Sequence, residues 1–558
     1  MKRLLLPMLV LLVYLPGFWW GAPHATGPER VNSWGVDDET PLGPLAEMHN
    51  ILEPKPDRNL GYPLMYSFVV AGSYAPYLGY LKMTGGMDSP SGEYPFGLAD
   101  PVSSLKMMSY IAHLVSVLMG VGVVLAAFET GRVLMNRCAG VLSALFAMTC
   151  YPMFYYARSG NVDVPVLCFM ALTLMMFARC LSLGFTSRRA IWLGVFAGFA
   201  LGTKEQALGA FLIIPFVLLA TCWREHEGRW RSRKFWRVPF AGTLASIIAF
   251  GIGSGLFVEP SRYWAHVTFM WDRVAIIARG DIYVPYVFPP DWAGNVGYVQ
   301  RVFELLRDMI TLPGVILGLA GLIWLLVRRP KAMWVAVTAI AYFGFIFYML
   351  RSPQMRYTMP VAYLLSFPAA WIVAAAWGRK EKILRWGMMA LAVSIIGFNF
   401  LRGVGLTYEM VQDSRYEAAQ WIADNTEAGD TVEYFGPSLK LPPLEASVTD
   451  RQTIDWIGIY RQPRVDDTAV QEILAGWEER RPRFIIIMPD LTSRPGVEHS
   501  TLCPPQLFQA LLDGSHGHVL EEEFKTEPLF SWIALPELDY PTVNPKIRVF
   551  TLPNSPRP

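Results

Sequence analysis

Long apolar runs separated by short polar connections dominate the first 400 residues. They cover residues 4–20, 105–128, 139–156, 163–181, 190–203, 206–223, 238–258, 309–327, 332–350, 359–377 and 386–401. A run of about 20 apolar residues is long enough for a helix to cross the hydrocarbon core of a bilayer. The pattern therefore predicts an α-helical polytopic membrane protein with about eleven transmembrane helices.

The first run has two interpretations. Lys2 and Arg3 precede it, and it ends in Phe18, Trp19 and Trp20, which are typical of a membrane interface. This pattern favours a retained transmembrane anchor. Small residues at 22–25 leave a cleaved signal peptide as the alternative.

The last part of the chain has a different pattern. Residues 414–425 and 505–512 are helix-like, whereas 430–435, 484–488, 519–524 and 547–552 are strand-like. We therefore predict two domains: a transmembrane domain at residues 1–401 and an α/β domain at 402–558.

Basic residues in the short connections predict the orientation, because Lys and Arg collect on the cytoplasmic side. The basic clusters all lie on one side of the membrane only if 190–223 forms two spans broken at 202–205 and if 62–81 is not a span. The N-terminus is then cytoplasmic, and the loops 21–104 and 259–308 and the tail are extracytoplasmic. The clusters lie at 132–137, 188–189, 224–237, 328–331 and 379–385.

Composition supports the membrane assignment. The chain has 558 residues, of which 53% are hydrophobic and 17% are charged, and its mean hydropathy is +0.30. These values exclude disordered and fibrous proteins and are too apolar for an ordinary soluble enzyme. The net charge of +2 implies no nucleic-acid partner. The six cysteines show no close paired spacing, so we expect neither a disulfide framework nor a cysteine metal site.

Three consecutive carboxylates in the first loop are the candidate catalytic residues: Asp37, Asp38 and Glu39. A carboxylate there could act as general base on an acceptor hydroxyl. Adjacent side chains point in different directions, so at most two can face one site, and Asp38 is our choice. The alternative is an acidic turn in which Asp38, followed by Thr40, caps a helix.

Cations on the expected outer face are candidate ligands for a phosphate. Lys204 lies at the break between two short spans, where a snorkelling lysine is the alternative. Arg351 and Arg356 place positive charge on a side that usually lacks it, next to Tyr357. Arg158 lies at another outer turn, where it could pair with Asp163 instead, and Asp163 could also be a helix N-cap.

Two further groups are weaker candidates. His266 and Arg273 lie among aromatic residues in the 259–308 loop, which could equally form an interfacial amphipathic helix. His516 and His518 suggest a metal site, but no third ligand is near them in the sequence.

The order of these motifs resembles the GT-C superfamily of polytopic glycosyltransferases. The closest branch is that of protein O-mannosyltransferases and the aminoarabinose transferase that modifies lipid A. The resemblance implies a polyprenyl-phosphate sugar as donor and a first-loop Asp as base. It places Asp38-Glu39 in the base motif, Asp163 at a second acidic position, Lys204 at the helix break and Arg356 at a late arginine. Asn59 to Pro63 match the family's aromatic and proline segment only in part.

That resemblance implies an inverting glycosyltransferase at the extracytoplasmic face, with a hexose or pentose donor and a protein, lipid or glycan acceptor. No cofactor is expected, because two or three cations could stabilise a monophosphate leaving group. A divalent ion held by Asp37, Asp38 and Asp163 is the alternative. We expect a bacterial cytoplasmic membrane. A secondary transporter or lipid flippase, or a non-catalytic envelope scaffold, is the competing function.

Overall fold

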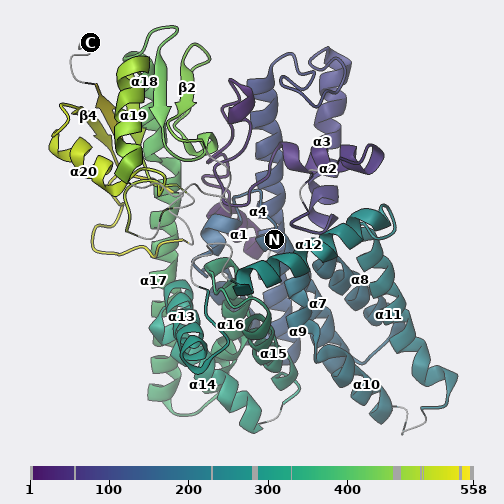
Figure 1. The fold of residues 1–558 in the computed structure, drawn as a ribbon. Helices are drawn as coiled ribbons and strands as arrows, with labels where there is room; N and C mark the ends of the chain where they lie inside the picture. The colour runs from purple at the N-terminus through teal and green to yellow at the C-terminus, as the bar shows by residue number, and fades with distance from the viewer. Residues whose placement is uncertain are drawn as a thin grey trace. The chain divides into compact units, whose positions relative to one another are not determined.

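The structure is a computed structural model in which the chain forms two compact units (Figure 1). It describes residues 4–55, 58, 60–225, 227, 230–279, 287–328, 330–455, 467–490, 493, 496–538 and 543–552. The first unit, called the membrane unit below, contains Met1–Phe18, Gly43–Ser73 and His113–Val404. The second unit contains Trp19–Leu42, Tyr74–Ala112 and Gly405–Pro558. The predicted domain boundary at residue 401 stays a prediction.

Helices make up the membrane unit. Those that lie wholly or mainly within it are α1 (Leu5–Tyr14), α2 (Leu42–Leu52), α5 (Arg137–Met148), α6 (Met153–Tyr156), α7 (Asp163–Leu183), α8 (Ser187–Thr203), α9 (Leu208–Phe211), α10 (Ile214–Glu225), α11 (Arg233–Gly253), α12 (Pro260–Arg279), α13 (Trp292–Ile310), α14 (Leu312–Arg328), α15 (Met333–Met349) and α16 (Met355–Trp377). Parts of α3 (Met65–Thr84), α4 (Pro101–Leu134) and α17 (Lys382–Val411) also belong to it.

Each of the eleven predicted apolar runs contains helix, which confirms the helical membrane fold. Within the described residues, six helical stretches are long and apolar enough to cross a membrane. They are Pro101–Leu134, Asp163–Leu183, Glu205–Glu225, Phe235–Gly253, Met355–Trp377 and Lys382–Asp424. Counting the pair α13 and α14, bent by 108°, as one span gives seven. Helix α3, over the 62–81 segment, is not among them, and the number eleven stays a prediction.

The first apolar run forms a shorter helix than predicted. Helix α1 has ten residues and ends at Tyr14, whereas the run continues to Trp20. Leu15 still has helical backbone, but Gly17 has a φ of +80°, which a right-handed helix cannot continue. The expected span of about 17 residues is therefore wrong in its length.

The predicted break after the fifth run is present. Helix α8 ends at Thr203, Lys204 has extended backbone, and a 3-10 turn, Glu205–Ala207, leads into α9. The break exposes backbone groups that a continuous helix would satisfy internally. It also places Lys204 in the interior of the membrane unit, where the residue is 6% exposed.

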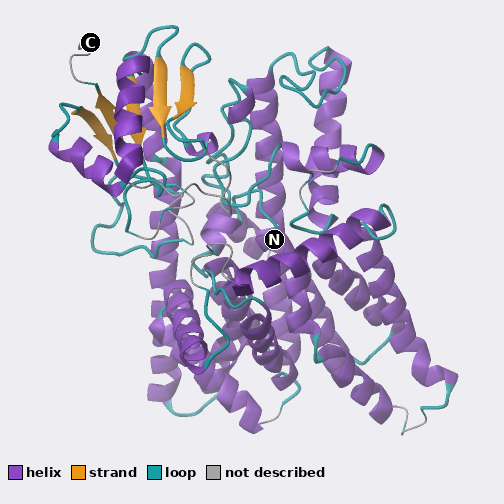
Figure 2. Cartoon of the chain, in the orientation of Figure 1, coloured by secondary structure: helices purple, strands orange, loops and turns teal. Residues whose placement is uncertain are grey.

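The tail forms a five-stranded sheet with helices packed on it (Figure 2). The strand order is β2-β1-β3-β5-β4, in which β1 is parallel to β2 and β3, and β5 is antiparallel to β3 and β4. The elements are α18 (Ser414–Asp424), β1 (Thr431–Tyr434), β2 (Thr449–Gln452), α19 (Asp467–Arg480), β3 (Phe484–Ile487), α20 (Pro505–Asp513), β4 (Val519–Phe524) and β5 (Ile547–Thr551).

Side chains of the central strands alternate between two cores, as the pleat of a strand requires. Phe484 and Ile486 of β3 pack in one core with Ile422 of α18, whereas Ile485 and Ile487 pack in the other. Helices α19 and α20 supply Trp477 and Phe508 to that second core. The predicted α/β fold of the tail is confirmed, although α19 and β2 were not predicted.

Helices α8 and α11 approach each other closely because glycines line their contact. A Cβ atom added at Gly194 would lie 2.1 Å from the Gly242 carbonyl oxygen, and one at Gly198 would lie 2.6 Å from the Ser246 carbonyl oxygen. Small residues four apart let helix backbones meet in a membrane and form many van der Waals contacts.

We expect Gly198→Leu to separate α8 from α11 and destabilise the protein by about 1–3 kcal/mol, because the added side chain meets backbone atoms that cannot move aside. Gly344→Leu is the matched control, since a Cβ there meets nothing within 4 Å. Thermal unfolding of both purified variants in detergent measures the difference. Equal unfolding temperatures would contradict this account of the packing.

Candidate functional site

A buried ion pair lies where α8 ends and α7 begins. The Lys204 Nζ donates to Asp163 Oδ1 at 2.7 Å, and the two side chains are 8% and 1% exposed. Asp163 Oδ2 has no hydrogen-bond partner within the described residues. Asp163 is the first residue of α7 and not its N-cap, and its backbone N–H donates to Asn161 Oδ1. The alternative in which Asp163 caps the helix is therefore wrong.

Two tyrosines enclose the Lys204 ammonium. Its nitrogen lies 4.7 Å from the Tyr357 ring centroid and 5.5 Å from the Tyr62 ring centroid. The guanidinium of Arg356 lies 4.9 Å from the Tyr357 ring, and its Nε donates to Gln354 Oε1. We call Tyr62, Asp163, Lys204, Arg356 and Tyr357 the Lys204 cluster. The structure thus brings together four candidate residues from separate parts of the sequence.

Arg273 also acts on this cluster, because its charge reaches the Tyr357 hydroxyl. Helix α12, which carries it, is the predicted amphipathic segment of the 259–308 loop. Residues 280–286 of that loop lie outside the described residues.

Three contacts that the sequence did not reveal fasten α12 to residues 47–62. Arg262 donates to Glu47 Oε2 at 3.0 Å and to the Tyr62 carbonyl at 2.9 Å. Arg58 donates to Glu259 Oε1 at 2.7 Å. These pairs join residues about 200 positions apart, so no local pattern could have identified them. They fix the backbone of Tyr62, whose ring lies over Lys204.

His266 makes a fourth contact with this segment. Its Nδ1 lies 2.6 Å from the Leu60 carbonyl, and its Nε2 contacts the Glu205 carboxylate. Both partners accept hydrogen bonds, so the charged imidazolium satisfies both contacts. Burial opposes this charge, but the hydrogen bond and charge of Glu205 outweigh it and raise the pKa of His266. His266 therefore positions the segment that follows Lys204.

Arg158 and Arg351 use their donors on backbone carbonyls. Arg158 is fully buried, and donates to the carbonyls of Tyr14, Val13 and Phe154. It therefore satisfies the C-terminal end of α1. Arg351 donates to the Phe288 and Pro289 carbonyls and to Asn295. This geometry favours structural roles for both arginines over phosphate binding, and Arg158 is not paired with Asp163.

Of the three first-loop carboxylates, Asp38 is buried and Asp37 and Glu39 are exposed. All three belong to the second unit. Asp38 Oδ1 accepts from the Thr40 backbone N–H at 3.1 Å and from its hydroxyl at 2.5 Å. These contacts form a turn of the Asx type before α2, which begins at Leu42, so they do not show Asp38 as the cap of that helix. The assignment of Asp38 as catalytic base stays a prediction.

A buried lysine of the tail accompanies Asp38 in the second unit. Lys440 Nζ donates to the carbonyls of Trp34 and Gly35. Burial and the positive charge of Arg415 lower the pKa of Lys440 to about 7, against the opposing charges of Asp38 and Asp490. The first loop is thus held to the tail beside the candidate base.

Further polar contacts secure this loop. Arg415 makes two hydrogen bonds of 2.8 Å to Asp413 and lies 3.9 Å from the Trp34 ring centroid. Trp20 Nε1 donates to Asp413 Oδ2 at 3.0 Å. Arg30 pairs with Asp450. The sequence placed the first loop and the tail on the same side of the membrane, but it did not predict that they form one unit.

No group of three or more His, Cys, Asp or Glu side chains converges on a possible metal position in the part of the chain that the structure describes. His518 lies against Trp477, with 5.5 Å between ring centroids. Asp38 and Asp163 belong to different units.

Comparison with known proteins identifies one family model, described as dolichyl-phosphate-mannose-protein mannosyltransferase, which matches residues 107–251. The predicted resemblance to membrane glycosyltransferases is confirmed over this segment. No curated protein matches the chain.

Solved structures of two other proteins are similar to this chain. Those of ArnT from Cupriavidus metallidurans, in the apo state and bound to undecaprenyl phosphate, are 12% and 13% identical, with TM-scores of 0.45 and 0.43. The matches cover 97% and 98% of both chains. An oligosaccharyltransferase from Archaeoglobus fulgidus is 12% identical, with 87% of this chain and 70% of that chain covered and a TM-score of 0.43.

We expect the contact of His266 with Glu205 to make stability pH-dependent. The pKa of His266 is raised, so its contribution is complete below the ordinary histidine pKa of about 6.5 and is lost as the pH rises through the folded value. His266→Gln should lower stability by about 1 kcal/mol at pH 6, because Glu205 is partly exposed, and by less at pH 9.

Thermal unfolding between pH 6 and pH 9 measures this difference. His49→Gln is the control, because His49 is an exposed histidine paired with an exposed Glu53. A loss of stability in His266→Gln that is the same at every pH would contradict a charged His266.

Proposed function

We propose that the chain is an inverting glycosyltransferase of the GT-C superfamily. It moves a sugar from a polyprenyl-phosphate carrier to a hydroxyl group of an acceptor at the extracytoplasmic face of a membrane. The observation that carries the proposal is the buried Lys204 at the helix break, within a cluster of aromatic rings and a second cation. The family match over residues 107–251 supports the same class of reaction.

The chemistry of the donor requires such cations. When the bond between the anomeric carbon and the phosphate oxygen breaks, the leaving phosphate gains negative charge. Lys204 and Arg356 would stabilise that charge, because both are fixed in an environment with little water, where electrostatic interactions are strong. A lysine ammonium has three donors, and Asp163 accepts one of them from Lys204. The phosphate would accept another.

Asp38 would take the proton of the acceptor hydroxyl. Attack on the face of the anomeric carbon opposite the phosphate inverts its configuration. Burial distinguishes Asp38 from Asp37 and Glu39, since water would screen the charge of an exposed carboxylate. Two cations can neutralise a monophosphate, so the reaction as proposed needs no metal ion. The sugar is a hexose or pentose, and the acceptor is a glycan, a lipid or a protein.

We expect Asp38→Asn to reduce sugar transfer by about 100- to 10,000-fold, the usual contribution of a general base, while donor binding is kept. The measurement is transfer of radiolabel from a panel of polyprenyl-phosphate sugars in membranes that contain the protein. Asp37→Asn and Glu39→Gln are matched controls, because they remove neighbouring exposed carboxylates. A chelator should leave transfer unchanged.

Transfer by Asp38→Asn at the wild-type rate would refute the assignment of the base. Loss of transfer in Asp37→Asn instead would move that role to Asp37. Failure of every donor that serves a known GT-C enzyme would refute the glycosyltransferase proposal itself.

The phosphate ligands are tested apart from the base, since they belong to a different unit. We expect Arg356→Gln to reduce kcat/KM for the sugar donor by about 100-fold. The variant loses one positioned cation that stabilises the negative charge of the leaving phosphate. Arg351→Gln is the matched control at the same turn. Its donors contact carbonyl oxygens, so it should lower the unfolding temperature and leave the rate per folded molecule unchanged. A larger rate loss in Arg351→Gln would contradict the division of roles.

A further inference from the structure

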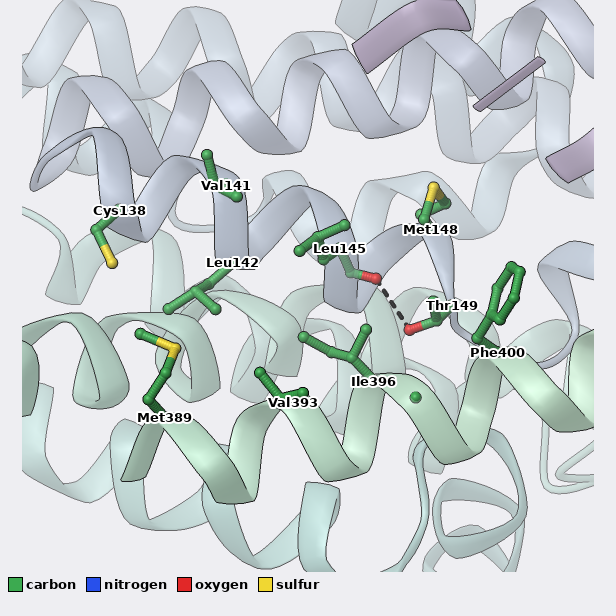
Figure 3. Close-up of a pocket in the computed structure, with 11 residues that line it drawn as sticks. Cys138, Val141, Leu142, Leu145, Met148, Thr149, Met389, Val393, Ile396 and Phe400 are labelled. Atoms are coloured by element: carbon green, nitrogen blue, oxygen red, sulfur yellow. Dashed lines mark hydrogen bonds between the residues drawn. The ribbon is translucent and has the colours of Figure 1, made fainter. Parts of the chain in front are cut away.

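An apolar groove runs between α5 and α17 in the membrane unit. Figure 3 shows Leu142 and Leu145 of α5 facing Val393 and Ile396 of α17 across it. Its volume is about 560 Å³, and its accessible lining is entirely apolar. The Thr149 hydroxyl, at one end, donates to the Leu145 carbonyl of its own helix. The groove therefore offers an occupant apolar contacts.

The length of the groove corresponds to one leaflet of a bilayer. It extends from Cys138 to Thr149 along α5 and from Met389 to Phe400 along α17. At a rise of about 1.5 Å per residue, each distance is about 16 Å. Half of the hydrocarbon core is about 15 Å thick. One extended acyl chain of a single leaflet matches this length.

The two helices run in parallel, so both N-termini lie at the same end of the groove (Figure 3). The positive ends of two helix dipoles therefore coincide there. Five cations lie at or just before these N-termini, with Glu381 as a carboxylate among them. They are Arg137, Arg379, Lys380, Lys382 and Arg385, and none forms an ion pair within the described residues.

Arg137 and Arg385 continue the lining of the groove by one helical turn. Arg137 is four residues before Val141, and Arg385 is four residues before Met389, and residues four apart share a helix face. Arg385 lies 5.1 Å from the ring centroid of Trp377 and 5.6 Å from that of Trp386. Its buried Nε has no hydrogen-bond partner within the described residues. Aromatic rings thus hold this cation at the mouth of the groove.

We propose that this groove is a binding site for an anionic glycerophospholipid, whose acyl chain fills the groove and whose phosphate contacts Arg385 and Arg137. Apolar length and positive charge at one end match the two parts of such a lipid, and basic pockets between transmembrane helices bind anionic headgroups. The site is separate from the proposed reaction. Helix α5 leads from this basic end towards α6 and Asp163, so the Lys204 cluster lies beyond the other end of α5.

The acyl-chain contact is tested by filling the groove. Gly397 lines it, and a Cβ added there meets nothing within 4 Å, so Gly397→Leu should occupy the groove without strain. Gly387→Leu is the matched control on the same helix: it has the same open space but is not among the lining residues. Native mass spectrometry of the full chain in detergent, titrated with dipalmitoyl phosphatidylglycerol or phosphatidylcholine, measures binding of the first lipid.

We expect phosphatidylglycerol to bind wild-type protein at least about fivefold more tightly than phosphatidylcholine, since each cation near a membrane surface contributes about this factor. Gly397→Leu should lose the tight site for both lipids, and Gly387→Leu should keep it. Arg385→Gln should lower affinity for phosphatidylglycerol by about fivefold and affect phosphatidylcholine less, because the choline ammonium already neutralises the phosphate of that lipid.

Equal affinities for the two lipids would overturn the proposal, as would identical behaviour of Gly397→Leu and Gly387→Leu. A polyprenyl monophosphate added as competitor tests whether the groove instead binds the carrier lipid of the sugar donor. The proposal is wrong if the polyprenyl monophosphate displaces phosphatidylglycerol from the wild-type protein and if Gly397→Leu no longer binds the polyprenyl monophosphate. The groove would then belong to a donor lipid.

Discussion

The ion pair between Lys204 and Asp163 is the interaction on which the membrane unit depends. The Lys204 ammonium is buried at the connection between α8 and α9, where an acceptor must come from the protein because burial of an unpaired charge is costly. Asp163, at the first turn of α7, supplies a carboxylate to the lysine at the end of α8. Loss of one partner would leave a buried charge, at a cost of about 3–5 kcal/mol. The ion pair therefore keeps a cation in the interior of the membrane unit.

Buried polar pairs have a similar role in the second unit, where they join segments far apart in the sequence. Trp20 and Asp413 are 393 residues apart, and Arg30 and Asp450 are 420 apart. An apolar contact would tolerate many arrangements, whereas a hydrogen-bonded charge fixes direction and distance. The backbone carbonyls next to Asp38 are bound to Lys440 in this way. A base that must meet a hydroxyl within hydrogen-bond distance benefits from such fixation.

The sequence predicted those features that depend on local patterns. The apolar runs located the helices because about 20 residues must cross the hydrocarbon core, and the short continuous apolar run at 484–488 located a buried strand. Strand β2 was missed because its sequence, Thr449–Gln452, is polar and lies at the sheet edge. The end of α1 was missed because the run of apolar residues continues past Pro16.

The candidate site was predictable in its residues but not in its contacts. Lys204 and Asp163 were each identified from their positions beside a helix end, yet their pairing joins residues 41 apart. Arg158 and Arg351 were predicted as phosphate ligands on the same reasoning, and their donors proved to be occupied by carbonyls. Sequence shows that a cation is present at a turn, but only packing decides which acceptors reach it.

This difference in partners separates the cations that can bind an anion from those that cannot. A carbonyl oxygen that accepts an N–H group consumes a donor, so N–H groups of Arg158 that a phosphate would need are already bound to carbonyls. An aromatic ring attracts a cation through its face and leaves most of the N–H groups directed elsewhere. Lys204 lies against Tyr62 and Tyr357, and Arg385 lies against Trp377 and Trp386. Both are thus fixed in position while retaining donors, which is what recognition of a phosphate requires at either site.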